Sequence, residues 1–95
     1  MRTSHTRVET EHASDYLIRL SKDWSRDFPT LTFDDRQAVI PFPGARAELV
    51  AGDAFLDITL VANSETQAVL LEHLLAGHLD SVAGGENLKY RWSFQ

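Results

Sequence analysis

The sequence predicts an α+β fold, a two-layer sandwich in which two helices cover one face of a mainly antiparallel sheet of five to six strands. Two segments have the three- and four-residue apolar spacing of amphipathic helices, and short alternating segments joined by turn residues surround them. Short links between consecutive strands require antiparallel pairing. We therefore expect the order strand, helix, four strands, helix, strand, with both helices on the same side of the sheet.

Residues 3–9 are the first expected strand and residues 13–27 the first expected helix. The strand is mostly polar, with Val8 as its clearly apolar residue, so we expect it at an edge of the sheet. The helix has Thr10 as its expected N-cap, and Pro29 stops it because proline disfavours helical geometry at the preceding residue. Its apolar stripe consists of Ala13, Tyr16, Leu17, Leu20 and Trp24.

Four short strands are expected between the helices. They cover residues 31–33, 38–42, 45–51 and 54–62, and turn signals separate them at Asp34-Asp35, Pro43-Gly44 and Gly52-Asp53. Pro41 suggests an edge or a bulge, because proline cannot donate to a ladder. Strict alternation in the last of these strands predicts a core-facing side made of Ala54, Leu56, Ile58, Leu60 and Ala62.

The second helix has the clearer signals of the two. Ser64 and Gln67 have the spacing of a capping box, and the Gly84-Gly85 pair ends the helix because glycine adopts left-handed geometry without steric cost. Its expected buried stripe is Ala68, Leu71, Leu74, Leu75, Leu79 and Val82. A final half-buried strand is expected over residues 88–94, and its removal should destabilise the domain.

Length and composition restrict the function. The 95 residues should form a single domain, residues 1–95, since so short a chain has no surplus for a second core. A net charge of −5 disfavours nucleic acid as a partner. The absence of cysteine excludes thiolate chemistry and disulfide scaffolds. No apolar run resembles a signal-peptide core or a membrane span, so we expect a cytoplasmic protein without a membrane partner.

His78 is the first candidate site residue, because its spacing places it within the apolar stripe of the second helix. With Asp23 and Asp27 on the first helix it could bind a metal or a small molecule. The simpler interpretation is a histidine paired with a carbonyl or a carboxylate at the margin of the core. No motif such as GxSxG or HExxH is present, so the sequence disfavours an enzyme, and we expect no catalytic residue and no cofactor.

The uncovered face of the sheet is the second candidate. Val39, Val50, Phe55 and Val61 should project from it among charged side chains. Monomers seldom leave a large apolar patch exposed, so this face could form a homodimer or dock onto another domain. The alternative is that isolated exposed apolar residues are normal and have no function.

Several short motifs resemble a bacterial family known as domain of unknown function 2218. They are Lys22-Asp23-Trp24, the PFPG turn at residues 41–44, the alternating residues 56–60, Gly77-His78-Leu79, Glu86-Asn87-Leu88 and Trp92. The resemblance covers nearly the whole chain. It implies an α+β domain that occurs alone or as an extension of siderophore-interacting flavoprotein reductases, which makes such a reductase an expected partner.

The chain departs from this family at its polar positions. Family members often have two histidines at the positions of Asp23 and Arg26, and arginines at the positions of Ser81 and Gly85. His78 is the matched residue that this chain retains. Two functions are therefore carried forward: an accessory binding module of bacterial siderophore-iron use that acts by docking or self-association, and a metal- or small-molecule-binding domain with its site near His78 and the first-helix carboxylates.

Overall fold

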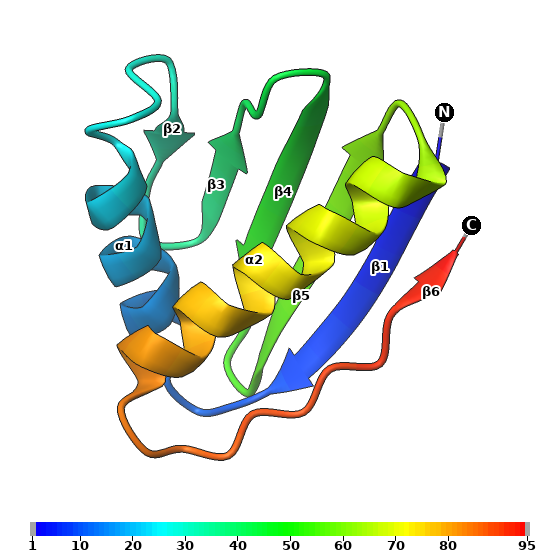
Figure 1. Ribbon diagram of the computed structural model, residues 1–95. Helices are drawn as coiled ribbons and strands as arrows, with labels where there is room; N and C mark the ends of the chain where they lie inside the picture. The colour runs from blue at the N-terminus through cyan, green and yellow to red at the C-terminus, as the bar shows by residue number, and fades with distance from the viewer. Residues whose placement is uncertain (1, 95) are drawn as a thin grey trace.

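The computed structural model describes residues 2–94 as six strands and two helices in the predicted order (Figure 1). The elements are β1 (Arg2–Glu9), α1 (Ala13–Trp24), β2 (Thr32–Phe33), β3 (Gln37–Ile40), β4 (Ala45–Ala51), β5 (Phe55–Ala62), α2 (Glu65–Ala83) and β6 (Ser93–Phe94). Every paired strand is antiparallel. Both helices lie on the same face of the sheet, which confirms the two-layer α+β architecture.

The strand order in the sheet is β2-β3-β4-β5-β1-β6. The polar β1 is therefore an inner strand, and the prediction that it forms an edge was wrong. Ser4 and Thr6 face the helices and are buried, but their hydroxyls have partners. Ser4 Oγ donates to Glu72 at 2.8 Å, and Thr6 Oγ1 accepts from the Arg91 backbone N–H at 2.9 Å. A polar strand can lie inside the sheet when its inward hydroxyls are satisfied in this way.

The core lies between the sheet and the two helices. The predicted alternation of β5 is confirmed, since Leu56, Ile58 and Leu60 are fully buried, although Ala54 is exposed and precedes the strand. On α2 the buried side is narrower than predicted. Leu74 is 50% exposed, because at 100° per residue it lies about 140° from the buried Leu79.

Helix α2 begins and ends where the sequence predicts. Ser64 Oγ accepts a hydrogen bond from the Gln67 N–H at 3.2 Å. In a capping box the Gln67 side chain would accept from the Ser64 N–H, but here its oxygen accepts from the N–H of the preceding residue, Asn63. Its amide nitrogen donates to the Pro43 carbonyl. At the other end Gly84 has φ 70°, the left-handed conformation that glycine adopts without strain. The cap therefore also fixes the β3–β4 connection against α2.

Helix α1 begins at Ala13 as predicted, but its N-cap residue and its end differ from the prediction. It stops at Trp24, so Asp27 lies in a turn after the helix. In this turn Asp27 and Phe28 both donate their N–H groups to the Trp24 carbonyl, and the Phe28 ring packs edge-on against Trp24. The N-cap residue is His12 and its side chain makes no capping bond. The hydroxyl of Thr10, the predicted cap, instead accepts from the His12 N–H at 3.1 Å.

The chain after α2 is mostly not a strand. Of the predicted strand over residues 88–94, only β6 is formed. Before β6, the Arg91 N–H donates to the side-chain hydroxyl of Thr6 in β1 and not to a backbone carbonyl of that strand. The segment still contributes to the core: Leu88 is buried, and Tyr90 and Trp92 are partly buried against it. The Tyr90 hydroxyl donates to Asp80 at 3.0 Å. We call residues 86–92 the C-terminal segment.

Pro41 follows directly after the end of β3, so the backbone needs no bulge to accommodate it. Across residues 2–94, neither helix combines the length and apolarity needed to cross a membrane.

Candidate functional site

The open face of the sheet carries the apolar residues that the sequence placed there, and charged side chains lie among them. Val39 and Val50 are exposed, whereas Phe55 and Val61 are partly buried. In the strand register Val39 lies opposite Glu48, and Val50 lies opposite Asp57. Each valine therefore has a charged neighbour on the adjacent strand. The four residues therefore lie among charged side chains, as the sequence predicts.

An ion cluster occupies the middle of this open face. Arg7 donates from Nε and Nη2 to the two carboxylate oxygens of Asp57, at 2.8 and 2.9 Å. His5 Nε2 lies 3.4 Å from the same carboxylate, and the Arg7 guanidinium stacks over the Phe55 ring at 4.1 Å. The hydrogen bond from Arg7 is the main reason why the pKa of Asp57 lies below its usual value. Phe55 is therefore covered in part by a cation.

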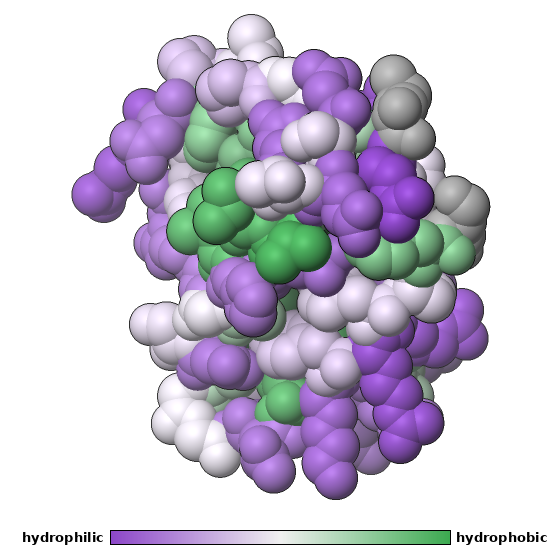
Figure 2. Space-filling view, turned by 45° about the vertical axis from the view of Figure 1, so that its right-hand side comes forward, coloured by the Kyte–Doolittle hydropathy of each residue, from purple (hydrophilic) through white to green (hydrophobic). Residues whose placement is uncertain are grey.

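The most exposed apolar side chains lie on α2 instead. Leu70 is 66% exposed and Leu74, one turn later, is 50% exposed. Figure 2 shows hydrophobic side chains gathered on this side of the molecule and bordered by polar ones. The part of the exposed side of the helix that we call the outer face of α2 comprises Thr66, Leu70, His73, Leu74, Gly77 and Ser81; Glu65, Val69 and Asp80 are exposed beside it.

The sequence interpretation missed the outer face of α2. The leucines of this helix spread over about half of its circumference, so the broad stripe was assumed to be buried throughout. One signal was available: Leu70 falls outside the predicted stripe and has no place in a helix with a single apolar side. Burial of Leu74 could not be decided from spacing alone, because the width of the buried side depends on how the sheet lies under the helix.

His78 is brought close to one of its two predicted partners. Its Nε2 lies 3.4 Å from Asp23 Oδ2, and its ring lies 4.7 Å from the Trp24 ring. Asp27 is exposed in the turn after α1 and, within residues 2–94, makes no hydrogen bond or ion pair with His78. Within residues 2–94, no group of three or more His, Asp or Glu side chains is placed to hold a metal ion.

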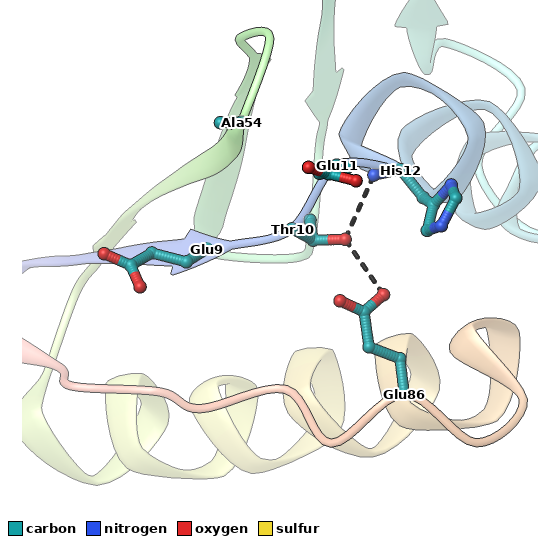
Figure 3. Close-up of a pocket in the computed structure, with 6 residues that line it drawn as sticks. All are labelled: Glu9, Thr10, Glu11, His12, Ala54 and Glu86. Carbon is teal, nitrogen blue, oxygen red and sulfur yellow. Dashed lines mark hydrogen bonds between the residues drawn. The ribbon is translucent and has the colours of Figure 1, made fainter.

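A polar cluster that the sequence did not reveal joins the C-terminal segment to the start of α1 (Figure 3). Glu86 points toward Thr10, and its Oε1 accepts from Thr10 Oγ1 at 2.9 Å and from the Tyr16 hydroxyl. The hydrogen bonds from Tyr16 and Thr10 lower the pKa of Glu86, and the hydrogen bond to Glu86 raises the pKa of Tyr16. The adjoining hollow is also lined by Glu9 and Glu11. Three carboxylates disfavour an anionic ligand here, and the hydrogen bonds give the cluster a structural role.

Comparison with known proteins identifies relatives but no activity. No curated protein matches this chain. Among solved structures, the chain is similar to the NMR structure of PA4090 from Pseudomonas aeruginosa, with 28% sequence identity and a TM-score of 0.83. That match covers 98% of this chain and 96% of PA4090, so the whole fold is shared.

A family comparison matches nearly the whole chain. Residues 5–93 fit the family described as "Uncharacterized protein conserved in bacteria (DUF2218)". These residues include all six strands in whole or in part, both helices, the His78–Asp23 pair and the outer face of α2. The chain therefore belongs to the bacterial DUF2218 family.

Proposed function

We propose that this domain is a non-enzymatic binding module of the bacterial cytoplasm that acts by self-association through the outer face of α2. The observation that carries the proposal is the pair Leu70 and Leu74, exposed by 66% and 50% one helical turn apart. Large apolar side chains that remain together on a monomer surface commonly mark a protein interface. They are also the largest exposed aliphatic side chains among the described residues.

A second copy of the chain is the occupant that fits this surface. The part of the outer face around Leu70 and Leu74 carries no Asp, Glu, Lys or Arg, and the exposed acidic residues Glu65 and Asp80 lie toward the two ends of the helix, whereas the whole chain has a net charge of −5. Two identical acidic proteins repel each other least where they meet through an uncharged patch. A two-fold axis would place the same patch on both sides of the contact. Gly77 leaves open space on this face, which allows the helices to approach closely.

The expected dimer is weak. Burial of the exposed part of each leucine contributes about 1 to 2 kcal/mol. The outer face is one side of one helix, and a stable interface buries roughly 800 Å² on each partner. We therefore expect a dissociation constant in the micromolar range or weaker, and a dimer fraction that rises with concentration.

Sedimentation velocity over a range of protein concentrations tests this proposal. Leu70→Glu should abolish the dimer, because it places like charges in the contact, and it should preserve the fold, because the position is exposed and glutamate favours helix. Val50→Glu on the open sheet face is the matched control, since Val50 is 47% exposed. If the control variant dissociates the dimer and Leu70→Glu does not, the sheet face predicted from sequence is the interface and the α2 proposal is wrong.

The iron context of the proposal rests on the family resemblance. The resemblance implies that related domains occur as extensions of siderophore-interacting flavoprotein reductases. Such a reductase is therefore the second expected partner. The test is binding of the purified domain to such a reductase from a bacterium whose genome encodes both. Measurable affinity that Leu70→Glu removes would assign the outer face of α2 to that partner. Absence of binding would remove the siderophore-iron context.

The second candidate function is metal or small-molecule binding at His78, favoured by its 3.4 Å approach to Asp23. Two side chains would supply two ligands, and solvent or a bound molecule would supply the others. The ring of Trp24 lies 4.7 Å from that of His78, so a bound Ni²⁺ ion should quench its fluorescence in a Trp92→Phe background. Loss of quenching in His78→Ala but not in Asp27→Asn would support a site made by the pair. Equal quenching in His78→Ala would exclude it.

A further inference from the structure

A basic groove runs along the open side of the sheet, between β1 and the chain that follows α2. One wall is made by outward residues of β1, among them His5, Arg7 and Glu9. The other wall is made by Lys89, Arg91 and Ser93. Because the ladder between β1 and β6 covers only two residue pairs, the two chains diverge beyond it and leave the groove between their side chains.

Alternation explains why cations line this groove. Leu88, Tyr90 and Trp92 of the C-terminal segment turn toward the core and are buried or partly buried. The residues between them, Lys89 and Arg91, must then point outward. They lie about 7 Å apart along an extended backbone, which is a suitable spacing for two anionic groups of one small ligand.

The two cations of the C-terminal segment are free to bind an anion. Among residues 2–94, neither Lys89 nor Arg91 has an acidic partner within 4 Å. Arg7 binds Asp57 through Nε and Nη2 and adds hydrogen-bonding capacity through its remaining nitrogen. Glu9 is the acidic residue among those that line the groove. This concentration of positive charge contrasts with the net charge of −5 of the chain.

The walls of the groove are held in place before any ligand arrives. The Arg91 N–H donates to Thr6 Oγ1 at 2.9 Å, and the neighbouring Tyr90 hydroxyl donates to Asp80 at 3.0 Å. Ser93 Oγ donates to the His5 carbonyl at 3.4 Å. Burial of Leu88 anchors the segment on the other side of Lys89. Binding would therefore order side chains and not backbone, which lowers its entropic cost.

We propose that this groove binds a small multivalent oxyanion, a phosphate-bearing or polycarboxylate molecule, between Lys89 and Arg91. Guanidinium and ammonium groups bind phosphate and carboxylate oxygens through charge-assisted hydrogen bonds. Arg7 supplies a further donor, its remaining guanidinium nitrogen, from the β1 wall of the groove. The site is made by the open side of the sheet, and the proposal does not depend on self-association through α2.

Amide chemical-shift titrations of the ¹⁵N-labelled protein with sodium pyrophosphate and, separately, with citrate test the site. At low salt we expect saturable shifts at Lys89, Arg91 and Ser93, and a weaker affinity at about 0.3 M salt because screening reduces the attraction. Tighter binding of pyrophosphate identifies a phosphate ligand, and tighter binding of citrate a polycarboxylate. Shifts that do not saturate, or that spread over the whole surface, would overturn the proposal.

Paired charge variants separate a site from a general charge effect. Lys89→Gln with Arg91→Gln should weaken binding tenfold or more while the spectrum remains dispersed. The control is Lys22→Gln with Arg26→Gln, which removes the same charge. Lys22 lies on α1 and Arg26 in the turn after it, and both are exposed. Among the described residues, neither has an acidic partner within 4 Å. This control should leave the affinity within about twofold. An equal loss in both double variants would show that net charge alone attracts the probe, and the site would be rejected.

Discussion

At the residue scale, Ser21 places an unpaired polar group in the apolar core. It lies on the core side of α1 and is fully buried, and its hydroxyl has no hydrogen-bond partner within the described chain. An unsatisfied buried hydroxyl costs on the order of 1 to 3 kcal/mol. Ser4 is equally buried but donates to Glu72 at 2.8 Å. The two serines therefore provide a comparison between an unpaired and a paired hydroxyl in one core.

Ser21→Ala should raise the free energy of unfolding by about 1 kcal/mol, because it removes the unpaired hydroxyl and alanine is the better helix former. Urea unfolding at neutral pH measures the change. Ser4→Ala, the matched control, should lower the same free energy by about 1 kcal/mol. If Ser21→Ala destabilises the protein as much as Ser4→Ala does, Ser21 has a partner in solution and this interpretation of the core is wrong.

At the scale of elements, the ends of α2 depend on particular residues. Gly84 ends the helix with φ 70°, which any residue with a Cβ adopts at a cost of about 1 kcal/mol. Gly77 lies within the helix, and a Cβ placed there meets nothing within 4 Å. The same substitution should therefore have opposite effects at the two positions.

Gly84→Ala should destabilise the domain by about 1 kcal/mol, and Gly77→Ala should stabilise it by about 0.5 to 1 kcal/mol. Denaturant unfolding of both variants at the same low protein concentration makes the comparison independent of self-association. The same sign of change in both variants would contradict the assignment of Gly84 as a left-handed cap.

The C-terminal segment stabilises the fold through side chains more than through a ladder. Leu88 is buried, whereas Phe94 in β6 is 46% exposed. Leu88→Ala should therefore lower the free energy of unfolding by about 2 to 4 kcal/mol. Phe94→Ala should lower it by less than about 1 kcal/mol, since little of that ring is removed from water. Thermal unfolding followed by circular dichroism gives both values. A larger loss of unfolding free energy for Phe94→Ala than for Leu88→Ala would show that the strand pairing at β6 contributes more than the buried side chains do.

At the scale of the whole molecule, hydrogen-bonded carboxylates and tyrosines set the pH range of stability. The pKa of Asp57 is lowered mainly by Arg7, that of Glu86 by Tyr16 and Thr10, and that of Asp34 by the backbone N–H groups of residues 36 and 37. Burial and Asp80 raise the pKa of Tyr90. These groups have different proton affinities in the folded and unfolded chain, so the free energy of unfolding depends on pH.

Stability should be greatest between about pH 5 and pH 9. The lowered carboxyl pKa values contribute stability above the unfolded values of 3.8 and 4.5, and this contribution is lost as the pH falls through the folded values. The raised pKa of Tyr90 contributes stability below its unfolded value of 10.0, which is lost at higher pH. Urea unfolding from about pH 3 to about pH 10 should give a smaller acid loss for Asp57→Asn than for the unsubstituted protein. Stability that rises between pH 5 and pH 3 would contradict the prediction.

Local patterns were sufficient for much of the fold. The alternation of β5, the cap at Ser64 and the left-handed stop at Gly84 are properties of neighbouring residues, and each appears where the sequence places it. Relations between distant segments were not available from such patterns. The inner position of β1 depends on the pairing of its hydroxyls with Glu72 and Arg91, far along the chain.

The candidate sites likewise include parts that local sequence patterns predicted and parts that depend on contacts between distant segments. The sequence placed His78 near the first helix, and the structure brings it to Asp23 but leaves Asp27 in a turn, because α1 ends at Trp24. The open sheet face was predicted with its residues but not with the Arg7–Asp57 ion pair that divides it. The outer face of α2 and the basic groove were both missed.

The sequence by itself determined the type and order of the elements, because apolar periodicity, capping residues and glycine stops act within a few residues of one another. The tertiary structure alone decided which strand lies at the edge, how much of α2 the sheet covers and which polar groups meet. Those outcomes depend on contacts between residues as far apart as Thr6 and Arg91, and no local pattern encodes such contacts. The basic groove belongs to this second class, since it exists only once β1 and the C-terminal segment have packed together. The outer face of α2 lies on one helix, but the packing of the sheet decides which side of that helix stays exposed.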